Sequence, residues 1–257
     1  MTSVGAPVLT DAARAALAEL LLALADDEFV IGFWDSEWTG IAPMLEEDVA
    51  MSSISQDEIR HARALYELPA ELTDADADAI AFGRAAAEFR HAALLNHART
   101  DWAFTIARRF LYESADAVRL EALARSSYQP LANLAAKMRR EEGYHRMHID
   151  TWLRRLAGGP GAQRLHEALD RAWPDAQALF TPLAGEQELV RSGILADPFG
   201  ELHRRWAEHV TAVLGELGIG LAPAAVPADG RTRRTEDFAW LHGQFTMVAA
   251  SEAGATW

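Results

Sequence analysis

The stretch MSSISQDEIRHARAL, residues 51–65, holds the pattern that decides the fold. Apolar side chains recur in it at helical spacing from Met51 to Leu65, and Glu58 and His61 occupy two positions on the same face. Residues three and four apart share one face of an α-helix, and the apolar face packs against the core. We therefore predict a helix whose buried face carries a carboxylate and an imidazole.

The same interruption of an apolar face recurs in three further helical stretches. Each has apolar residues at helical spacing, with acidic or imidazole side chains among them. These side chains are Glu28, Glu113, Glu142 and His145. Burying several carboxylates together is strongly unfavourable unless cations neutralise them. A metal site between four helices is the simplest explanation.

The positions of the glutamates along the chain support this interpretation. Residues equidistant from the turn of an antiparallel helical hairpin lie at the same level of the bundle. The midpoint of Glu28 and Glu58 falls in the turn Gly-Ile-Ala-Pro, and that of Glu113 and Glu142 falls in Ser-Ser-Tyr-Gln-Pro. Each pair is therefore expected to meet at matching depth.

Two Glu-x-x-His motifs, Glu58 to His61 and Glu142 to His145, complete a known ligand set. Ferritin-like di-iron and di-manganese bundles use one such motif from each of two helices and one Glu from each of the other two. Oxygen and imidazole ligands suit iron or manganese. We predict two metal ions, iron with manganese as the alternative. The predicted ligands are Glu28, Glu58, His61, Glu113, Glu142 and His145.

Three residues beside these ligands are candidates for orienting them. Asp57 and Glu141 each precede a ligand glutamate, and Asp57 or Arg60 is placed to hold a ligating group. Such outer contacts set the orientation of metal-bound imidazoles and carboxylates.

Neighbouring acidic residues leave alternatives open. Asp26 or Asp27 could replace Glu28, which they adjoin, and Asp116 lies one turn from Glu113. A third Glu-x-x-His motif, at 88–91, has no matching carboxylate at equal depth across a short turn. We predict that it lies on a solvated helix face.

Composition indicates an all-α protein. Half of the 257 residues are hydrophobic, which suits one substantial core, and Ala, Leu, Glu and Arg dominate while β-branched runs are scarce. We predict a single ferritin-like domain, 1–257, with a four-helix bundle over about 9–156 and a C-terminal helical extension over about 161–257. The expected helices span about 9–38, 44–68 (ended by Pro69), 79–98, 101–125, 131–156, 162–179, 198–217 and 237–250.

Charge and residue usage exclude several classes of function. The formal net charge of -14 disfavours nucleic acid as a partner. No apolar run approaches the roughly 20 residues of a membrane span, and no signal sequence is visible, so we expect a cytoplasmic protein. The chain has no cysteine, which leaves histidine and carboxylates as metal ligands.

Two further groups of residues have simpler explanations. Four aromatic residues at helical spacing are predicted to belong to the core, with the lining of a pocket for an aromatic substrate as the alternative: Phe29, Phe33, Trp34 and Trp38. Five basic residues are predicted to form ion pairs on helix surfaces, with contact to a phosphorylated ligand as the alternative: Arg108, Arg109, Lys137, Arg139 and Arg140.

With these motifs placed, the chain resembles the phenylacetate-catabolism oxygenase family, the ferritin-like subunits of phenylacetyl-CoA epoxidase. The resemblance spans nearly the whole chain. It is carried by DSEW (35–38), AP (42–43), LEED (45–48), SQDEIRHAR (55–63), DWAFTIAR (101–108), EEGYH (141–145) and the ending GATW (254–257).

The resemblance implies a function and partners. The family has a catalytic A-type subunit, which binds di-iron and the acyl-CoA, and a structural C-type subunit that pairs with it. The length and ending of this chain resemble the C-type, whereas its six ligand positions resemble the A-type. The A-type chemistry implies O2 activation with electrons from a separate reductase, and oxygenation of an aromatic acyl-CoA.

Other functions stay open. The chain would act as a homo- or hetero-oligomer with related ferritin-like subunits. One alternative is a non-catalytic structural subunit that pairs with a catalytic A-type partner. Another is a ferroxidase or iron-binding ferritin-like protein.

Overall fold

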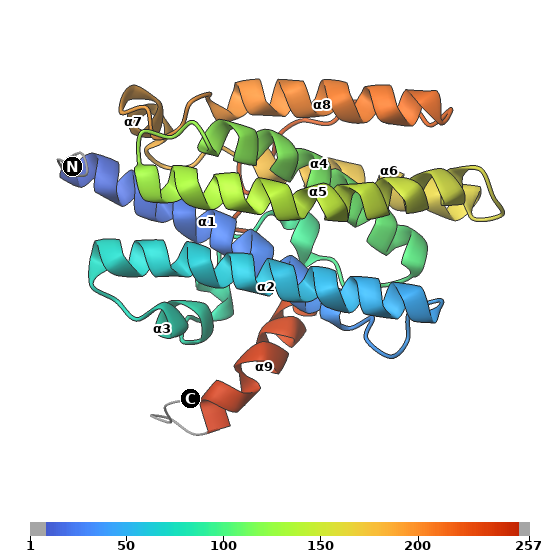
Figure 1. The fold of residues 1–257 in the computed structure, drawn as a ribbon, viewed down its shortest axis with the longest axis horizontal. Helices are drawn as coiled ribbons and strands as arrows, with labels where there is room; N and C mark the ends of the chain where they lie inside the picture. Colours follow the sequence, from blue (N-terminus) through green and yellow to red (C-terminus); the bar gives the residue numbers. More distant parts are fainter. Residues whose placement is uncertain (1–8, 252–257) are drawn as a thin grey trace.

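The computed structural model describes residues 9–251, and no strand occurs among them. Four long helices form the bundle: α1 (Asp11–Ser36), α2 (Leu45–Thr73), α4 (Trp102–Leu123) and α5 (Gln129–Ala157). In this bundle α1 packs mainly on α2, and α4 packs mainly on α5 (Figure 1). The predicted all-α, ferritin-like class is confirmed.

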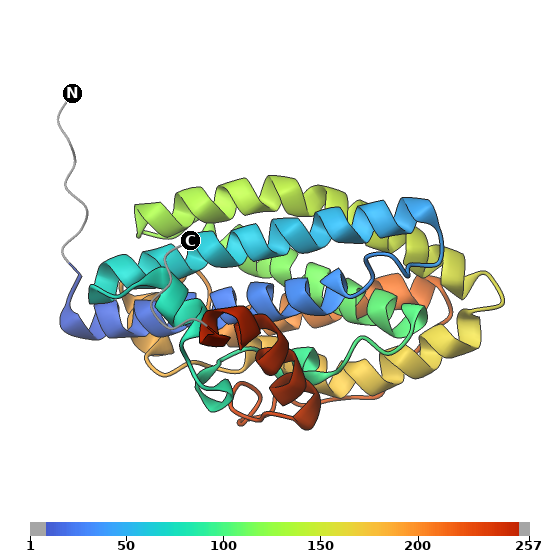
Figure 2. The same cartoon turned by 90° about the horizontal axis from the view of Figure 1, so that it is seen from below.

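Shorter helices surround this bundle. They are α3 (Ala77–Phe82), α6 (Ala162–Ala176), α7 (Glu186–Arg191), α8 (Phe199–Glu216) and α9 (Glu236–Ser251), with 3-10 turns at Ala86–Glu88, Ala93–Asn96 and Gln177–Phe180. Both α6 and α8 pack on α4, whereas α9 contacts α1 and α3. Figure 2 shows α9 lying across the bundle beside α3. The C-terminal helices therefore cover opposite sides of the bundle.

The close approach of α1 and α2 depends on Gly32. A Cβ atom at this position would lie 2.9 Å from Cγ1 of Ile59, 3.0 Å from Cβ of Glu58 and 3.2 Å from the Ser55 carbonyl oxygen. The first of these distances is shorter than real Cβ contacts, and the other two are tighter than nine in ten of them. The absence of a side chain at Gly32 thus lets α2 bring Glu58 against α1.

The aromatic cluster is part of the core, as predicted. Phe29, Trp34 and Trp38 are buried and Phe33 is half-buried. The Phe29 ring lies 4.8 Å from Phe33 and 5.0 Å from Phe245 of α9, between ring centroids. Aromatic packing therefore ties the last helix to the first.

Two predictions about the helices are wrong: where α2 ends, and that one helix spans 79–98. α2 does not end before Pro69 but runs through it to Thr73. A proline removes one backbone hydrogen bond from a helix, but Pro69 is buried in the last turn, where packing holds the helix together. The predicted helix at 79–98 is only α3 and two 3-10 turns. Carboxylates of α1 bind this segment instead, since Asp27 Oδ1 accepts from the Ala92 N–H at 2.8 Å.

Within the described part of the chain, none of the helices is both long enough and apolar enough to cross a membrane.

Candidate metal centre

Six side chains from the four long helices converge in the middle of the bundle. They form two groups, each with one candidate ligand atom per residue, and the atoms of a group lie within 4.8 Å of one another. The first group is Glu28, Glu58, His61 and Glu142, and the second group is Glu58, Glu113, Glu142 and His145. The structure thus brings together all six residues that the sequence singled out.

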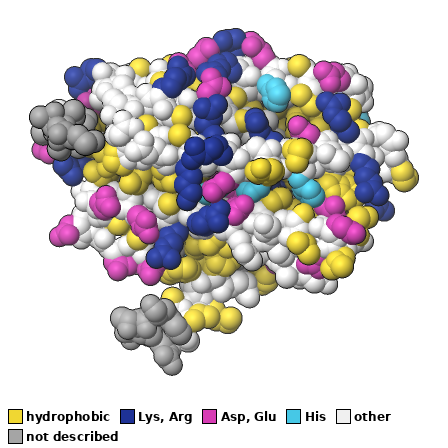
Figure 3. Space-filling view, viewed as in Figure 1, with side chains coloured by type: hydrophobic (Ala, Val, Ile, Leu, Met, Phe, Trp, Pro, Cys, Tyr) yellow, Lys and Arg dark blue, Asp and Glu magenta, His cyan; other side chains and the backbone are white. Residues whose placement is uncertain are grey.

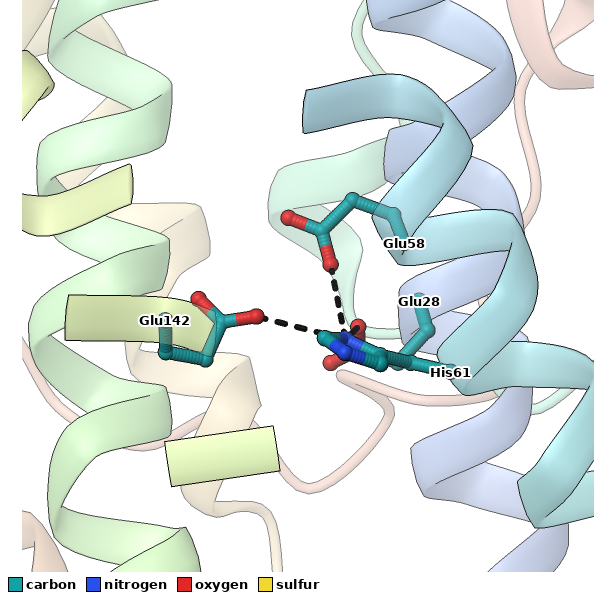
Figure 4. A group of neighbouring side chains, drawn as sticks. All are labelled: Glu28, Glu58, His61 and Glu142. Carbon is teal, nitrogen blue, oxygen red and sulfur yellow. Dashed lines mark ion pairs between the residues drawn. The ribbon is translucent and has the colours of Figure 1, made fainter. Parts of the chain in front are cut away.

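Glu58 and Glu142 belong to both groups, and their two oxygens point in different directions. Glu142 Oε1 lies 3.3 Å from His61 Nδ1, while Oε2 lies 3.2 Å from His145 Nδ1. For Glu58 the corresponding distances are 3.7 Å from Oε2 to His61 and 3.5 Å from Oε1 to His145. Figure 4 shows Glu58 and Glu142 approaching His61 from different helices. Two carboxylates shared in this way can bridge a pair of cations.

Burial makes this arrangement costly without a cation. All six residues are at most 3% exposed. In the first group every inward atom lacks a hydrogen-bond partner: Glu28 Oε2, Glu58 Oε2, His61 Nδ1 and Glu142 Oε1. A buried polar atom left unpaired costs about 1–3 kcal/mol. A divalent ion bound by these oxygen and nitrogen atoms would remove that cost, so the residues present fit iron or manganese.

The outer nitrogen of each histidine faces an acid from the other Glu-x-x-His helix. His61 Nε2 lies 2.8 Å from Glu141 Oε2, and His145 Nε2 lies 3.2 Å from Asp57 Oδ2. Each acid therefore orients the imidazole across the bundle and turns its Nδ1 inward. Arg60 contacts the two acids instead of a histidine, at 2.7 Å from Asp57 and 3.4 Å from Glu141.

Sequence reasoning missed two residues that touch these groups. Tyr112 donates to Glu28 Oε1 at 2.7 Å, which leaves Oε2 of that carboxylate facing the first group. Arg109 donates from Nη1 to Glu58 Oε1 at 2.6 Å and pairs through Nη2 with Glu113. The sequence could have indicated the contact of Arg109 with Glu113, because the two residues are one helical turn apart on the same face.

The surface role predicted for two arginines is wrong. Arg108 and Arg109 are both fully buried, and both face the buried carboxylate of Asp35. Their charges are needed inside the bundle because so many carboxylates are buried there. The other three basic residues, Lys137, Arg139 and Arg140, are exposed.

The acidic alternatives to Glu28 and Glu113 bind other partners. Asp26 accepts from the Tyr66 hydroxyl at 2.5 Å. Arg119 donates to Asp27 at 2.7 Å and to Asp116 at 3.0 Å. These contacts hold the three carboxylates outside both groups.

The third Glu-x-x-His motif also lies outside both groups, but its predicted solvated face is only partly correct. Glu88 is exposed, whereas His91 is fully buried. His91 Nε2 lies 3.0 Å from Asn96 Oδ1, so its polar contact is with the last residue of the neighbouring 3-10 turn.

The proximity of these groups shifts their protonation. Burial, and then the charge of Glu58, raise the pKa of Glu28 well above its usual value. Burial and the Glu58 charge also act to raise the pKa of Glu142, but hydrogen bonds with His145 and His61 outweigh them and lower it to about 2. Burial opposes the charge of His145, but contacts with Glu142 and Glu58 raise its pKa to about 11. Protons and Arg109 thus offset the carboxylate charges when no metal is bound.

Two adjoining pockets open between α4, α5 and α8 and reach these groups. The larger has a volume of about 500 Å³ and includes Glu113 in its wall, and the smaller has about 340 Å³ and includes Glu142. Their walls carry five basic or imidazole side chains: Arg139, Arg146, Arg154, Arg205 and His209. Figure 3 shows Lys and Arg side chains in a stripe across this face, over α5.

Comparisons with known proteins agree with the family that the sequence resembles. Residues 4–257 match the family described as phenylacetic acid catabolic protein. The chain is 30% identical over 208 residues to the C-type subunit of 1,2-phenylacetyl-CoA epoxidase from Escherichia coli (strain K12), covering 80% of this chain and 84% of that relative. It is 28% identical over 176 residues to the A-type subunit from the same organism, covering 68% of this chain and 57% of that relative. The chain therefore belongs to the phenylacetic acid catabolic protein family.

Proposed function

We propose that this chain is a di-iron carboxylate subunit of an oxygenase of the phenylacetyl-CoA epoxidase type. Its proposed metal ligands are Glu28, Glu58, His61, Glu113, Glu142 and His145, with manganese as the alternative metal. The observation that carries the proposal is the convergence of four buried atoms without partners in the first group. The relatives named as epoxidase subunits support the reaction class.

The residues around the centre have distinct tasks in this proposal. Iron bound there would activate O2 with electrons from a separate reductase, for oxygenation of an aromatic acyl-CoA. Glu58 and Glu142 would hold both ions, because each presents one oxygen to either histidine. Glu141 and Asp57 keep the imidazoles oriented. Every proposed ligand is buried, so helix packing shields the centre from bulk water except where the two pockets reach Glu113 and Glu142.

The two pockets provide a route for an anionic substrate. A coenzyme A thioester carries phosphate groups, and guanidinium groups bind phosphates with paired hydrogen bonds. Arg139, Arg146, Arg154 and Arg205 line pockets whose walls include Glu113 and Glu142. A local basic lining is needed because the formal net charge of -14 repels anions at long range.

Metal content of the full chain tests this function. Protein produced with ample iron and purified without oxygen should contain about two irons per chain, as two-metal carboxylate sites do. Replacing Glu58 and His61 together with Ala should abolish iron binding. The matched control changes the other motif, with Glu88→Ala and His91→Gln, and should retain both irons. Iron-free wild-type protein, or two irons in the first double variant, would contradict the proposal.

A non-catalytic protein that pairs with a catalytic relative is the second candidate. The extent of the sequence matches favours it, because this chain matches 84% of the length of the C-type relative but 57% of the length of the A-type relative. The iron spectrum separates the two candidates. An oxygenase centre bleaches on reduction and responds to O2, whereas a structural protein shows neither change.

A further inference from the structure

The two groups of candidate ligands differ in one respect that their residue types do not reveal. In the first group all four inward atoms lack hydrogen-bond partners. In the second group Arg109 donates to Glu58 Oε1 at 2.6 Å and pairs with Glu113. His145 Nδ1 also lies at hydrogen-bonding distance, 3.2 Å, from Glu142 Oε2. Arg109 therefore already contacts Glu113 and the Glu58 oxygen that faces His145, whereas Glu58 Oε2, which faces His61, has no such partner.

Arg109 is a permanent part of this interior. Its side chain is fully buried on α4, one helical turn before Glu113. A guanidinium stays protonated in proteins, so its positive charge remains whatever else binds nearby. Any metal ion entering the second group must share Glu58 and Glu113 with this charge, and like charges at close range repel.

A neighbouring carboxylate offers Arg109 another partner. Asp35 Oδ2 lies 3.5 Å from Arg109 Nη1 and has no hydrogen bond, while Asp35 Oδ1 accepts from Arg108 at 2.8 Å. A small movement of the guanidinium toward Asp35 would complete that bond. The same movement would release Glu58 Oε1 and Glu113 from Arg109.

We propose that Arg109 makes the two metal positions unequal, so that they fill in a set order. The first group binds its divalent ion first. The second group binds its ion only in competition with Arg109, whose guanidinium moves toward Asp35 as Glu58 and Glu113 are taken up by the metal. This order rests on the proposed di-metal centre and adds to it a residue that controls how the centre is assembled.

Stepwise titration of the metal-free full chain with Mn(II) tests this order. Calorimetry measures the two affinities, and electron paramagnetic resonance distinguishes isolated Mn(II) from coupled pairs. We expect the second ion to bind wild-type protein at least about tenfold more weakly than the first, a coupling of ordinary size. Isolated Mn(II) should dominate at one equivalent.

Variants of the two buried arginines isolate the cause. Arg109→Met keeps much of the side-chain volume but removes the charge, and should strengthen binding of the second ion about tenfold. Coupled pairs should then form from the first additions. Arg109→Lys keeps a charge and should retain the order. Arg108→Met is the matched control, because Arg108 contacts Asp35 but neither group, and it should also retain the order.

Histidine variants keep the test decisive if Arg109→Met fails to fold. His61→Ala should remove the tight phase, and His145→Ala should remove only the weak phase. Equal affinities in wild-type protein, loss of the tight phase in His145→Ala, or an unchanged order in folded Arg109→Met would each overturn the role of Arg109. Wild-type protein that binds no Mn(II) and no iron would overturn the di-metal centre itself, which is a distinguishable result.

Discussion

The carboxylate of Glu141 on α5 lies 2.8 Å from Nε2 of His61 on α2. The adjacent residue of α5, Glu142, faces the other nitrogen of the same ring at 3.3 Å. One imidazole is thus held between consecutive acids of the opposite helix, one outside the candidate centre and one within it. Asp57 and His145 repeat the outer contact in the opposite direction.

Removing the outer acid should weaken metal binding without removing a proposed ligand. For Glu141→Ala we expect metal affinity at the first group to fall about 10- to 100-fold, the usual effect of losing such a contact. Calorimetric titration with Mn(II) measures it. Glu67→Ala is the control, since Glu67 is an exposed acid of α2 whose partner is Arg63. Unchanged affinity in Glu141→Ala would show that His61 does not need this contact.

Adding a methyl group at Gly32 should separate α1 from α2 at the centre. Gly32→Ala places Cβ 2.9 Å from Ile59 Cγ1 and 3.0 Å from Glu58 Cβ. Overpacking of this kind costs about 1–3 kcal/mol. We expect lower unfolding free energy in urea and weaker metal binding, because Glu58 must move.

The matched control for Gly32 is Gly143, which lies inside the second Glu-x-x-His motif. A Cβ at Gly143 meets nothing within 4 Å. Alanine is favoured over glycine inside a helix by roughly 0.8–1 kcal/mol, so Gly143→Ala should be neutral or stabilising. Equal behaviour of the two variants would contradict the importance of the close approach at Gly32.

Removing metal should lower the thermal stability of the protein. Free metal at about 100 times its dissociation constant stabilises a folded protein by about 2.7 kcal/mol per site. For a chain of this size that corresponds to a rise in Tm of about 5–10 °C. Differential scanning calorimetry with and without a chelator measures the change. The Glu58→Ala, His61→Ala double variant should show no shift, and an equal shift there would point to metal bound elsewhere.

Asp175 should contribute stability that depends on pH. A hydrogen bond with His97 is the largest influence on its carboxyl and, with the nearby Arg233 charge, it lowers the pKa below the usual 3.8 despite burial. A depressed pKa stabilises the folded state above the unfolded value of 3.8, and this contribution disappears as the pH falls through the folded value.

Comparing Asp175→Asn with wild type in urea measures that contribution. Because Asp175 is only half-buried, we expect a loss of at most about 1 kcal/mol at neutral pH, and no difference in strong acid. Asp170→Asn, an exposed residue on the same helix, serves as the control. A difference between Asp175→Asn and wild type that grows as the pH falls below 3.8 would have the wrong sign for this mechanism.

The helical class and the convergence of the six candidate residues could be predicted because they depend on spacing. Glu58 and His61 share a face with apolar neighbours, so the residues that bury the helix also bury them. Their depth follows from the lengths of the two hairpins. The single-domain organisation and the metal-binding role of these residues stay predictions.

Residue spacing predicts secondary structure less reliably where a segment binds side chains from distant parts of the chain. Residues 79–98 have the composition of a helix, but Asp26 and Asp27 of α1 accept their backbone N–H groups at Arg90 and Ala92. Local propensity is weak compared with such tertiary contacts. The same contacts explain why Glu28, and not its acidic neighbours, reaches the centre.

The sequence by itself determined the four amphipathic helices, the six side chains on their inner faces and the family. Only the tertiary structure decided which acid orients which histidine and that Arg109 pairs with Glu113 and with the Glu58 oxygen that faces His145. The physical reason is that helical periodicity specifies the face on which a residue lies. The partner that each side chain meets depends on how closely the helices approach, which Gly32 allows, and on the charges buried between them.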